Sequence, residues 1–185
     1  NSSSKIAAGI YNPTVLKRYN MSWNGNEFHK NAIKFYKKIE SRYNIKIIFE
    51  HQIIKFFSSF SDQNNWVVAS QKPQLKEFID SEIQTKKIKG LITDFGYGLV
   101  KKCGRVSTPT LINEFKGNLK DNYIKQDFDF KKLHYDHTKI VYDNIVAQNI
   151  VFCEGYSIIN NPFFKNLPVR GSKGEFLVVK IPNLN

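Results

Sequence analysis

The chain has 185 residues, of which 41% are hydrophobic and 14% aromatic, and this composition excludes an intrinsically disordered protein. The net charge of +12 makes nucleic acid a candidate partner. The basic residues are not clustered, however, but are spread along the chain in pairs such as Lys37-Lys38 and Lys86-Lys87, which argues against a dedicated binding patch. No apolar run approaches the about 20 residues needed to cross a bilayer, so no membrane span is expected.

In the first half of the chain, sequence patterns predict one long helix and several short elements. Residues 1–19 have the Ser, Gly and Pro content of loops. Apolar side chains recur every three or four positions over residues 26–43 and predict an amphipathic helix, whose lysines are expected to face solvent. Runs rich in Ile and Phe at 45–49 and 52–57 predict two adjacent strands. Ser61 is expected to cap a short helix ending near Ala69, and another short helix is expected at 74–80.

In the second half of the chain, sequence patterns predict one more helix, with strands before and after it in the sequence. Glycines at 90, 96 and 98 indicate strands with a bend over 90–103. Thr108-Pro109 supplies a cap and a favourable first residue for a helix, in which Leu111, Ile112, Phe115 and Leu119 form the buried stripe. Strands are predicted at 123–129, 139–142, 145–152 and 175–181.

Together these elements predict an α+β fold. We expect one domain over residues 1–185, with a mainly antiparallel mixed β-sheet of about eight strands and roughly two to three flanking helices. Two cysteines, Cys103 and Cys153, form no C-x-x-C pair, which favours a reduced, cytoplasmic protein. Cys153 lies in an apolar run and is expected to be buried.

Four segments carry recognisable motifs. Ser3-Ser4-Lys5-Ile6-Ala7-Ala8-Gly9 has the form S-S-x-x-A-A-G, and residues 149–157 end in V-F-C-E-G-Y-S. Gly104-Arg105-Val106-Ser107-Thr108-Pro109 and Pro168-Val169-Arg170-Gly171 lie between and after them. In this order the segments resemble the D-amino-acid-oxidase-like (DAO) family of FAD-dependent oxidoreductases, which includes glycine and sarcosine oxidases. The resemblance covers nearly the whole chain, although each motif alone is weak.

The resemblance implies FAD as the cofactor and a substrate-binding domain with flavin contacts near 1–18 and 149–157. The first segment would run past the flavin, where small side chains allow close approach. The cofactor-binding residues that it implies are Ser3, Ser4, Ala7, Ala8, Gly9, Phe128, Cys153 and Gly155. Glu154 departs from the small residue of the family, and it either bonds a ribose hydroxyl or faces solvent.

In this family the flavin accepts a hydride from a C–N bond, so no catalytic acid or base is predicted. The substrate carboxylate usually needs a cation, and an arginine fork suits it. The predicted substrate-binding residues are Tyr11, Arg18, Tyr97, Arg105 and Arg170. The alternatives are surface ion pairs for the arginines and ordinary positions in a sheet for the tyrosines. His134-x-x-His137 lacks further ligands in a recognised pattern, so no metal site is predicted.

The predicted function is oxidation of a small-molecule amine or amino acid by an FAD-dependent oxidoreductase. No G-x-G-x-x-G is present and the chain starts at Asn1, so we expect an interior piece without the dinucleotide-binding segment and the C-terminal part. Residues 1–185 alone are therefore expected to bind FAD weakly and to be inactive. Two alternatives remain open, namely a basic module that binds nucleic acid such as tRNA, and a non-enzymatic interaction domain.

Overall fold

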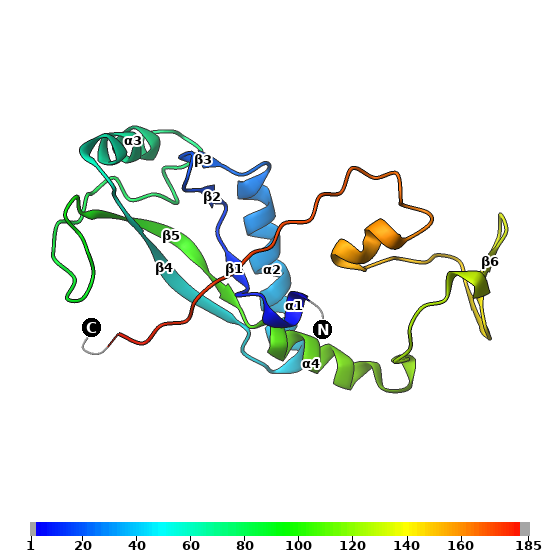
Figure 1. The fold of residues 1–185 in the computed structure, drawn as a ribbon. Helices are drawn as coiled ribbons and strands as arrows, with labels where there is room; N and C mark the ends of the chain where they lie inside the picture. Colours follow the sequence, from blue (N-terminus) through cyan, green and yellow to red (C-terminus); the bar gives the residue numbers. More distant parts are fainter. Residues whose placement is uncertain (1–2, 182–185) are drawn as a thin grey trace. The chain divides into compact units, whose positions relative to one another are not determined.

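The computed structural model describes residues 3–181, which form two compact units (Figure 1). Unit 1 comprises residues 3–118 and 177–181, and unit 2 comprises residues 119–176. The sequence predicted a single domain over residues 1–185, the ends of which lie outside the described residues. The predicted α+β class is confirmed, because helices combine with three small antiparallel sheets. None of the helices in residues 3–181 is long and apolar enough to cross a bilayer.

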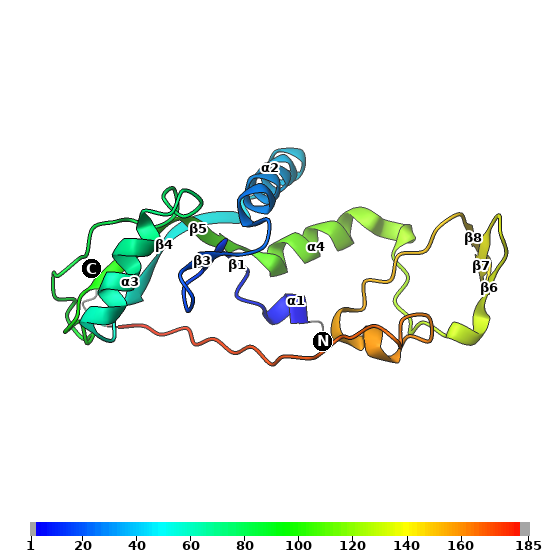
Figure 2. The same cartoon turned by 90° about the horizontal axis from the view of Figure 1, so that it is seen from above.

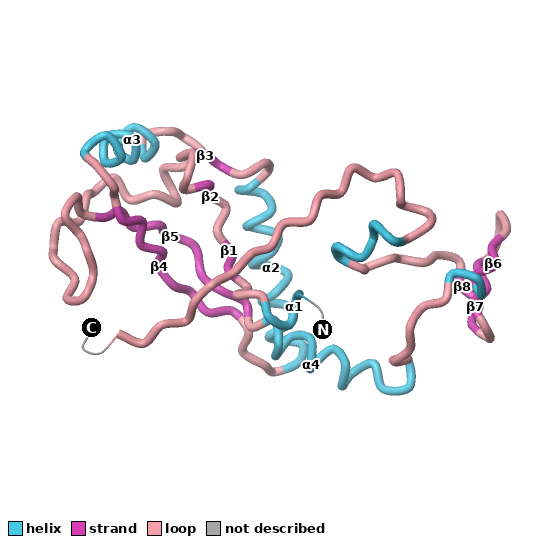
Figure 3. The backbone as a smooth tube through the Cα atoms, viewed as in Figure 1, coloured by secondary structure: helices cyan, strands magenta, loops and turns pink. Residues whose placement is uncertain are grey.

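The centre of unit 1 is a three-stranded antiparallel sheet. Its order is β1 (Ile10–Tyr11), β5 (Tyr97–Val106) and β4 (Ile48–Phe56), with β5 in the middle (Figure 3). β5 contains one extra residue near Lys102, whose φ is +54°. Such a bulge bends the strand and redirects the side chain that it carries.

The long helix α2 (Gly25–Tyr43) confirms the helix predicted at 26–43. It packs on the end of the sheet through a buried cluster of Ile39, Ile47, Ile48 and Val106. The Glu40 carboxylate accepts hydrogen bonds from the backbone N–H groups of Ile47 and Ile48, at 2.8 and 2.9 Å. These bonds connect the last turns of α2 to the beginning of β4.

The helix α3 (Phe60–Ser70) buries the largest side chain of unit 1. The side chain of Ser59, rather than the predicted Ser61, caps it by accepting a hydrogen bond from the Asp62 N–H group. Trp66 is fully buried, and its indole N–H donates to the Asp80 carbonyl oxygen at 2.7 Å. The surrounding cluster consists of Phe57, Ala69, Leu75, Ile79, Val100 and Cys103.

The helices α2 and α3 cover opposite faces of the sheet. Ile48 belongs to the cluster under α2, whereas Ile53 packs against the cluster under α3. Side chains alternate along a strand, so positions 48 and 53 of β4 face opposite sides. Figure 2 shows the helices near different ends of the β4–β5 pair.

Apart from α4, the remaining elements are short. In unit 1 they are α1 (Ser3–Ile6), the hairpin β2 (Thr14–Val15) and β3 (Asn20–Met21), and α4 (Thr108–Leu119), the last residue of which belongs to unit 2. Unit 2 contains β6 (Leu133–Tyr135), β7 (Ile140–Tyr142) and β8 (Ile145–Ala147), together with the 3₁₀ turns η1 (Lys120–Asn122), η2 (Phe130–Lys132) and η3 (Gly155–Asn160). Its three strands form an antiparallel meander.

Several predicted elements were wrong. The strands predicted at 45–49 and 52–57 are one strand, because residues 50 and 51 continue the pairing with β5. Residues 74–80 form turns instead of a helix. The strands predicted at 123–129 and 175–181 are absent, and the one predicted at 145–152 is limited to β8. Strand propensity produces a strand only where a neighbouring edge accepts its hydrogen bonds.

The predicted start of α4 is confirmed at Thr108, but its predicted buried stripe is not. No residue of α4 is buried, and Phe115 and Leu119 are 39% and 42% exposed. Only Leu111 of this helix packs against the cluster under α2.

Candidate functional site

The candidate site is the junction between β1 and the end of β5. β1 pairs there with Gly104 and Arg105. The Val106 N–H group donates a hydrogen bond to the Gly9 carbonyl oxygen at 2.9 Å. The motif ending at Gly9 and the motif beginning at Gly104 are thus adjacent in space, although they are far apart in the sequence.

Two glycines permit this close approach of backbones. Gly9 has a φ of +68°, and a Cβ atom there would collide with the Val106 carbonyl oxygen. A Cβ atom on Gly104 would collide with the carbonyl oxygen of Phe49 and the hydroxyl group of Tyr11. Glycine is therefore required at both positions, for backbone conformation at Gly9 and for space at both.

Arg105 is the cation of this junction. Its guanidinium group lies 5.0 Å from the ring centroid of Phe49, its partner residue on β4. The side chain is exposed. Within residues 3–181, neither Arg105 nor Arg18 nor Arg170 forms an ion pair with a carboxylate. The surface ion pairs considered as the alternative for these arginines are thus absent from the described part of the chain.

The structure separates the other predicted substrate residues of unit 1 from Arg105. Tyr11 pairs with Gly104 and therefore faces α2, on the opposite side of the sheet from Arg105. Burial raises the pKa of the Tyr11 hydroxyl, and the nearby Glu50 carboxylate adds to the effect. Tyr97 is buried at the far end of β5, and Arg18 is exposed in the turn between β2 and β3.

The small residues of the first motif remain accessible. Ser3 and Ser4 are exposed in α1, Ala7 is exposed, and Ala8 and Gly9 are half-buried. A flat ring that approached this backbone would meet no large side chain from residues 7–9.

The remaining predicted cofactor residues lie in unit 2. Phe128 stacks on Tyr142, with ring centroids 4.4 Å apart and an interplanar angle of 12°. Cys153 is exposed, so its predicted burial was wrong. Residues 149–154 form no strand, and Gly155, with a φ of +58°, begins η3.

Glu154 contacts a buried side chain of unit 2. Its carboxylate accepts a hydrogen bond from the side-chain amide of Asn161 at 2.7 Å. Asn161 is fully buried, and its side-chain oxygen accepts a further bond from the Phe163 N–H group at 3.0 Å. Glu154 therefore satisfies a buried amide, a role that its place in the motif did not indicate.

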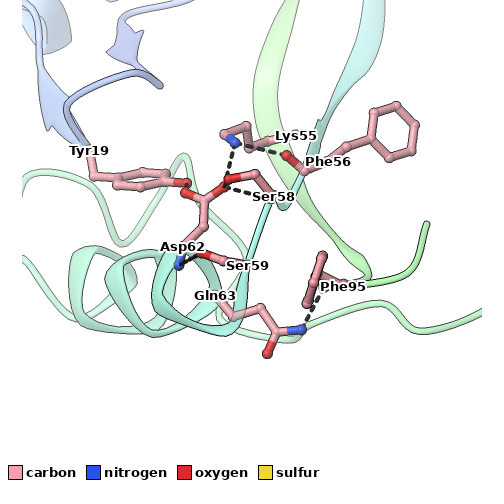
Figure 4. Close-up of polar contacts among 8 residues, drawn as sticks. All are labelled: Tyr19, Lys55, Phe56, Ser58, Ser59, Asp62, Gln63 and Phe95. Carbon is pink, nitrogen blue, oxygen red and sulfur yellow. Dashed lines mark hydrogen bonds and ion pairs between the residues drawn. The ribbon is translucent and has the colours of Figure 1, made fainter. Parts of the chain in front are cut away.

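A second polar cluster centres on Asp62 (Figure 4). The Tyr19 hydroxyl donates to one carboxylate oxygen, and the other accepts from Lys55 Nζ at 2.8 Å and from the Ser58 N–H group at 3.0 Å. Burial opposes ionisation of Asp62, but these donors outweigh it and lower the pKa to about 2. Because every donor is internal, the cluster connects the β2–β3 turn, β4 and α3 rather than leaving an acid free for catalysis.

The cluster makes stability depend on pH. The lowered pKa means that Asp62 contributes fully above its ordinary pKa near 3.8, and that the contribution is lost as the pH falls through about 2. We expect Asp62→Asn to lower the free energy of unfolding at neutral pH by about 1–3 kcal/mol. The difference from the unmodified chain should shrink as the solution is acidified toward pH 2.

Urea denaturation followed by far-ultraviolet circular dichroism at several pH values measures this effect. Asp94→Asn is the control, because Asp94 is an exposed loop residue and should change stability little. Equal stability of the Asp62 variant and the unmodified chain at neutral pH would contradict the assignment.

Within residues 3–181 no three His, Cys, Asp or Glu side chains are arranged to hold a metal ion.

Comparison with known proteins adds no assignment. No protein-family model matches the chain, and no solved structure gives a significant match.

Proposed function

We propose that the chain is part of a cytoplasmic FAD-dependent oxidoreductase that oxidises a C–N bond of an amine or amino acid. The observation that carries the proposal is the junction of the Ser3–Gly9 motif with the Gly104–Pro109 motif. The resemblance implies that a strand ends and a helix begins within the Gly104–Pro109 motif. In agreement, β5 ends at Val106 and α4 begins at Thr108.

The residues at the junction are suited to binding a flavin ring and a substrate carboxylate. FAD, when bound, supplies the hydride acceptor. Ala7 and Ala8 keep the neighbouring backbone accessible to a planar ring. Arg105 would bind the substrate carboxylate, since its guanidinium group is exposed and has no internal ion pair within residues 3–181. Tyr11 faces away from Arg105, so we assign it to the support of the sheet rather than to the substrate.

Replacing Arg105 tests the proposal through its substrate preference. In the protein expressed from its complete reading frame, Arg105→Ala should lower kcat/KM for amino acids roughly a hundredfold, because a charge-assisted bond to the carboxylate is lost. Oxidation of amines without a carboxylate should change little. Arg42→Ala is the matched control, since Arg42 is exposed and also lies over an aromatic ring, that of Tyr43 at 5.5 Å, but belongs to α2, which covers the opposite face of the sheet from Arg105.

The measurement is steady-state oxidation of an amino acid and of its decarboxylated amine by each variant. An equal loss for both substrates would exclude carboxylate binding by Arg105. An amino acid activity that Arg105→Ala leaves intact would exclude it as well.

A further inference from the structure

A groove of about 660 Å³ lies beside α2 and shares no lining residue with the β1–β5 junction. Ile33 and His29 of α2 line it together with Phe78, which belongs to the turn segment opposite. The lysines that line it are Lys30, Lys34, Lys37 and Lys38 from α2 and Lys102 from β5. The predicted solvated face of the α2 lysines is confirmed, because all four are exposed, and this face forms one wall of the groove.

The groove has a strong excess of positive charge. The single carboxylate among its described lining residues, Glu77, pairs with Lys102 at 2.5 Å. None of the four α2 lysines forms an ion pair within the described residues. From Lys30 to Lys38 the row extends over roughly 12 Å of helix axis, at 1.5 Å per residue. A row of this length exceeds what one small anion needs.

Lys102 reaches the groove from an unusual backbone conformation. It is the bulge residue of β5, and its φ of +54° is unfavourable for a residue with a side chain. Its ammonium group lies 5.8 Å from the ring centroid of Phe78. The bulge therefore directs a cation toward the same groove that the α2 lysines line.

The chemistry of the groove favours phosphate over carboxylate. It contains lysines and no arginine, and lysine binds phosphate as a point charge, whereas planar carboxylates select the arginine fork. Ile33 is half-buried and provides apolar surface between the charged walls, whereas Phe78 is buried beneath the groove. A concave wall suits a strand that passes along it better than a flat membrane.

We propose that this groove binds a single strand of nucleic acid through its phosphates, with little preference between RNA and DNA. The proposal does not depend on the oxidoreductase assignment, because the groove shares no residue with the β1–β5 junction. Glu77 is the only carboxylate among the described residues that line the groove, and its negative charge weakens the attraction for phosphate.

The test is fluorescence anisotropy of labelled oligouridine and oligothymidine of roughly a dozen nucleotides, with residues 1–185 and over a range of salt. The triple variant Lys30→Gln/Lys34→Gln/Lys37→Gln should bind at least about tenfold more weakly, and its plot of log Kobs against log salt should be less steep by about 2. Glu77→Gln should bind more tightly than the unmodified chain.

The matched control removes the same charge elsewhere. Lys86, Lys87 and Lys89 are exposed loop lysines, and Lys86→Gln/Lys87→Gln/Lys89→Gln should change affinity by less than about twofold. Equal losses in the two triple variants would overturn the proposal in favour of general charge attraction. Absence of salt-dependent binding would overturn it, and so would equally tight binding of polyglutamate or of phosphatidylglycerol vesicles.

Discussion

Trp66→Ala should lower the free energy of unfolding of the chain by about 3–5 kcal/mol, the range observed when large buried aromatic side chains are truncated. Trp66 is fully buried and packs edge-to-face against Tyr19 and Phe57, at centroid distances of 6.0 and 5.6 Å. Its removal also leaves the Asp80 carbonyl oxygen without its indole donor. Urea denaturation followed by far-ultraviolet circular dichroism measures the loss.

A pair of glycine substitutions tests the packing of the Trp66 ring against the backbone of β5. A Cβ atom on Gly98 would collide with the Trp66 ring, so Gly98→Ala should destabilise the chain by roughly 1–3 kcal/mol. Gly117 is the control, because a Cβ atom there meets nothing within 4 Å and the residue lies within α4. Gly117→Ala should instead stabilise the helix by up to about 1 kcal/mol. Equal effects at the two glycines would contradict the described contact between Gly98 and Trp66.

Gly9→Ala should separate β1 from β5 and, in the protein expressed from its complete reading frame, abolish flavin binding. The substitution places a methyl group against the Val106 carbonyl oxygen and imposes a positive φ on alanine, so a loss of stability of at least about 2 kcal/mol is expected. Absorbance of the bound flavin and urea denaturation are the two measurements.

The control for Gly9 is Gly174→Ala, since a Cβ atom on Gly174 meets nothing within 4 Å and its φ is not positive. That variant should retain both stability and flavin. If Gly9→Ala loses stability but keeps its flavin, the junction is structural and does not contribute to the cofactor site.

Local sequence patterns located the three longest helices, although the short helix predicted at 74–80 is absent. The three- and four-residue spacing of apolar side chains located α2, and Thr108-Pro109 located the start of α4. A helix closes its own hydrogen bonds, so its signal is contained in neighbouring residues. Burial was less predictable, because no apolar residue of α4 is fully buried even though the spacing of these residues is that of a buried stripe.

Strands and the candidate site depended on partners that are distant in sequence. Residues 174–181 have the composition of a strand, yet Leu177 and Val178 are both 89% exposed and unpaired in the described chain. The separation of Tyr11 from Arg105 follows from the register of β1 on β5, and a shift by one residue would reverse it. No local pattern specifies that register.

The lining of the groove could likewise not be predicted from local sequence, because it depends on the bulge at Lys102. The lysines of α2 are visible as a periodic face, but nothing in the sequence indicates that the bulge turns a fifth lysine toward them. The Asp62 cluster was also missed, because its donors come from three separate segments. Spacing between Tyr19, Lys55 and Asp62 carries no signal that the three meet.

The visible absorption spectrum of the purified protein, expressed from its complete reading frame, tests the central proposal most directly. We predict the two-band spectrum of an oxidised flavin, which bleaches when an amino acid or amine is added without oxygen. A protein that is colourless as purified and stays colourless after incubation with FAD would contradict the oxidoreductase assignment.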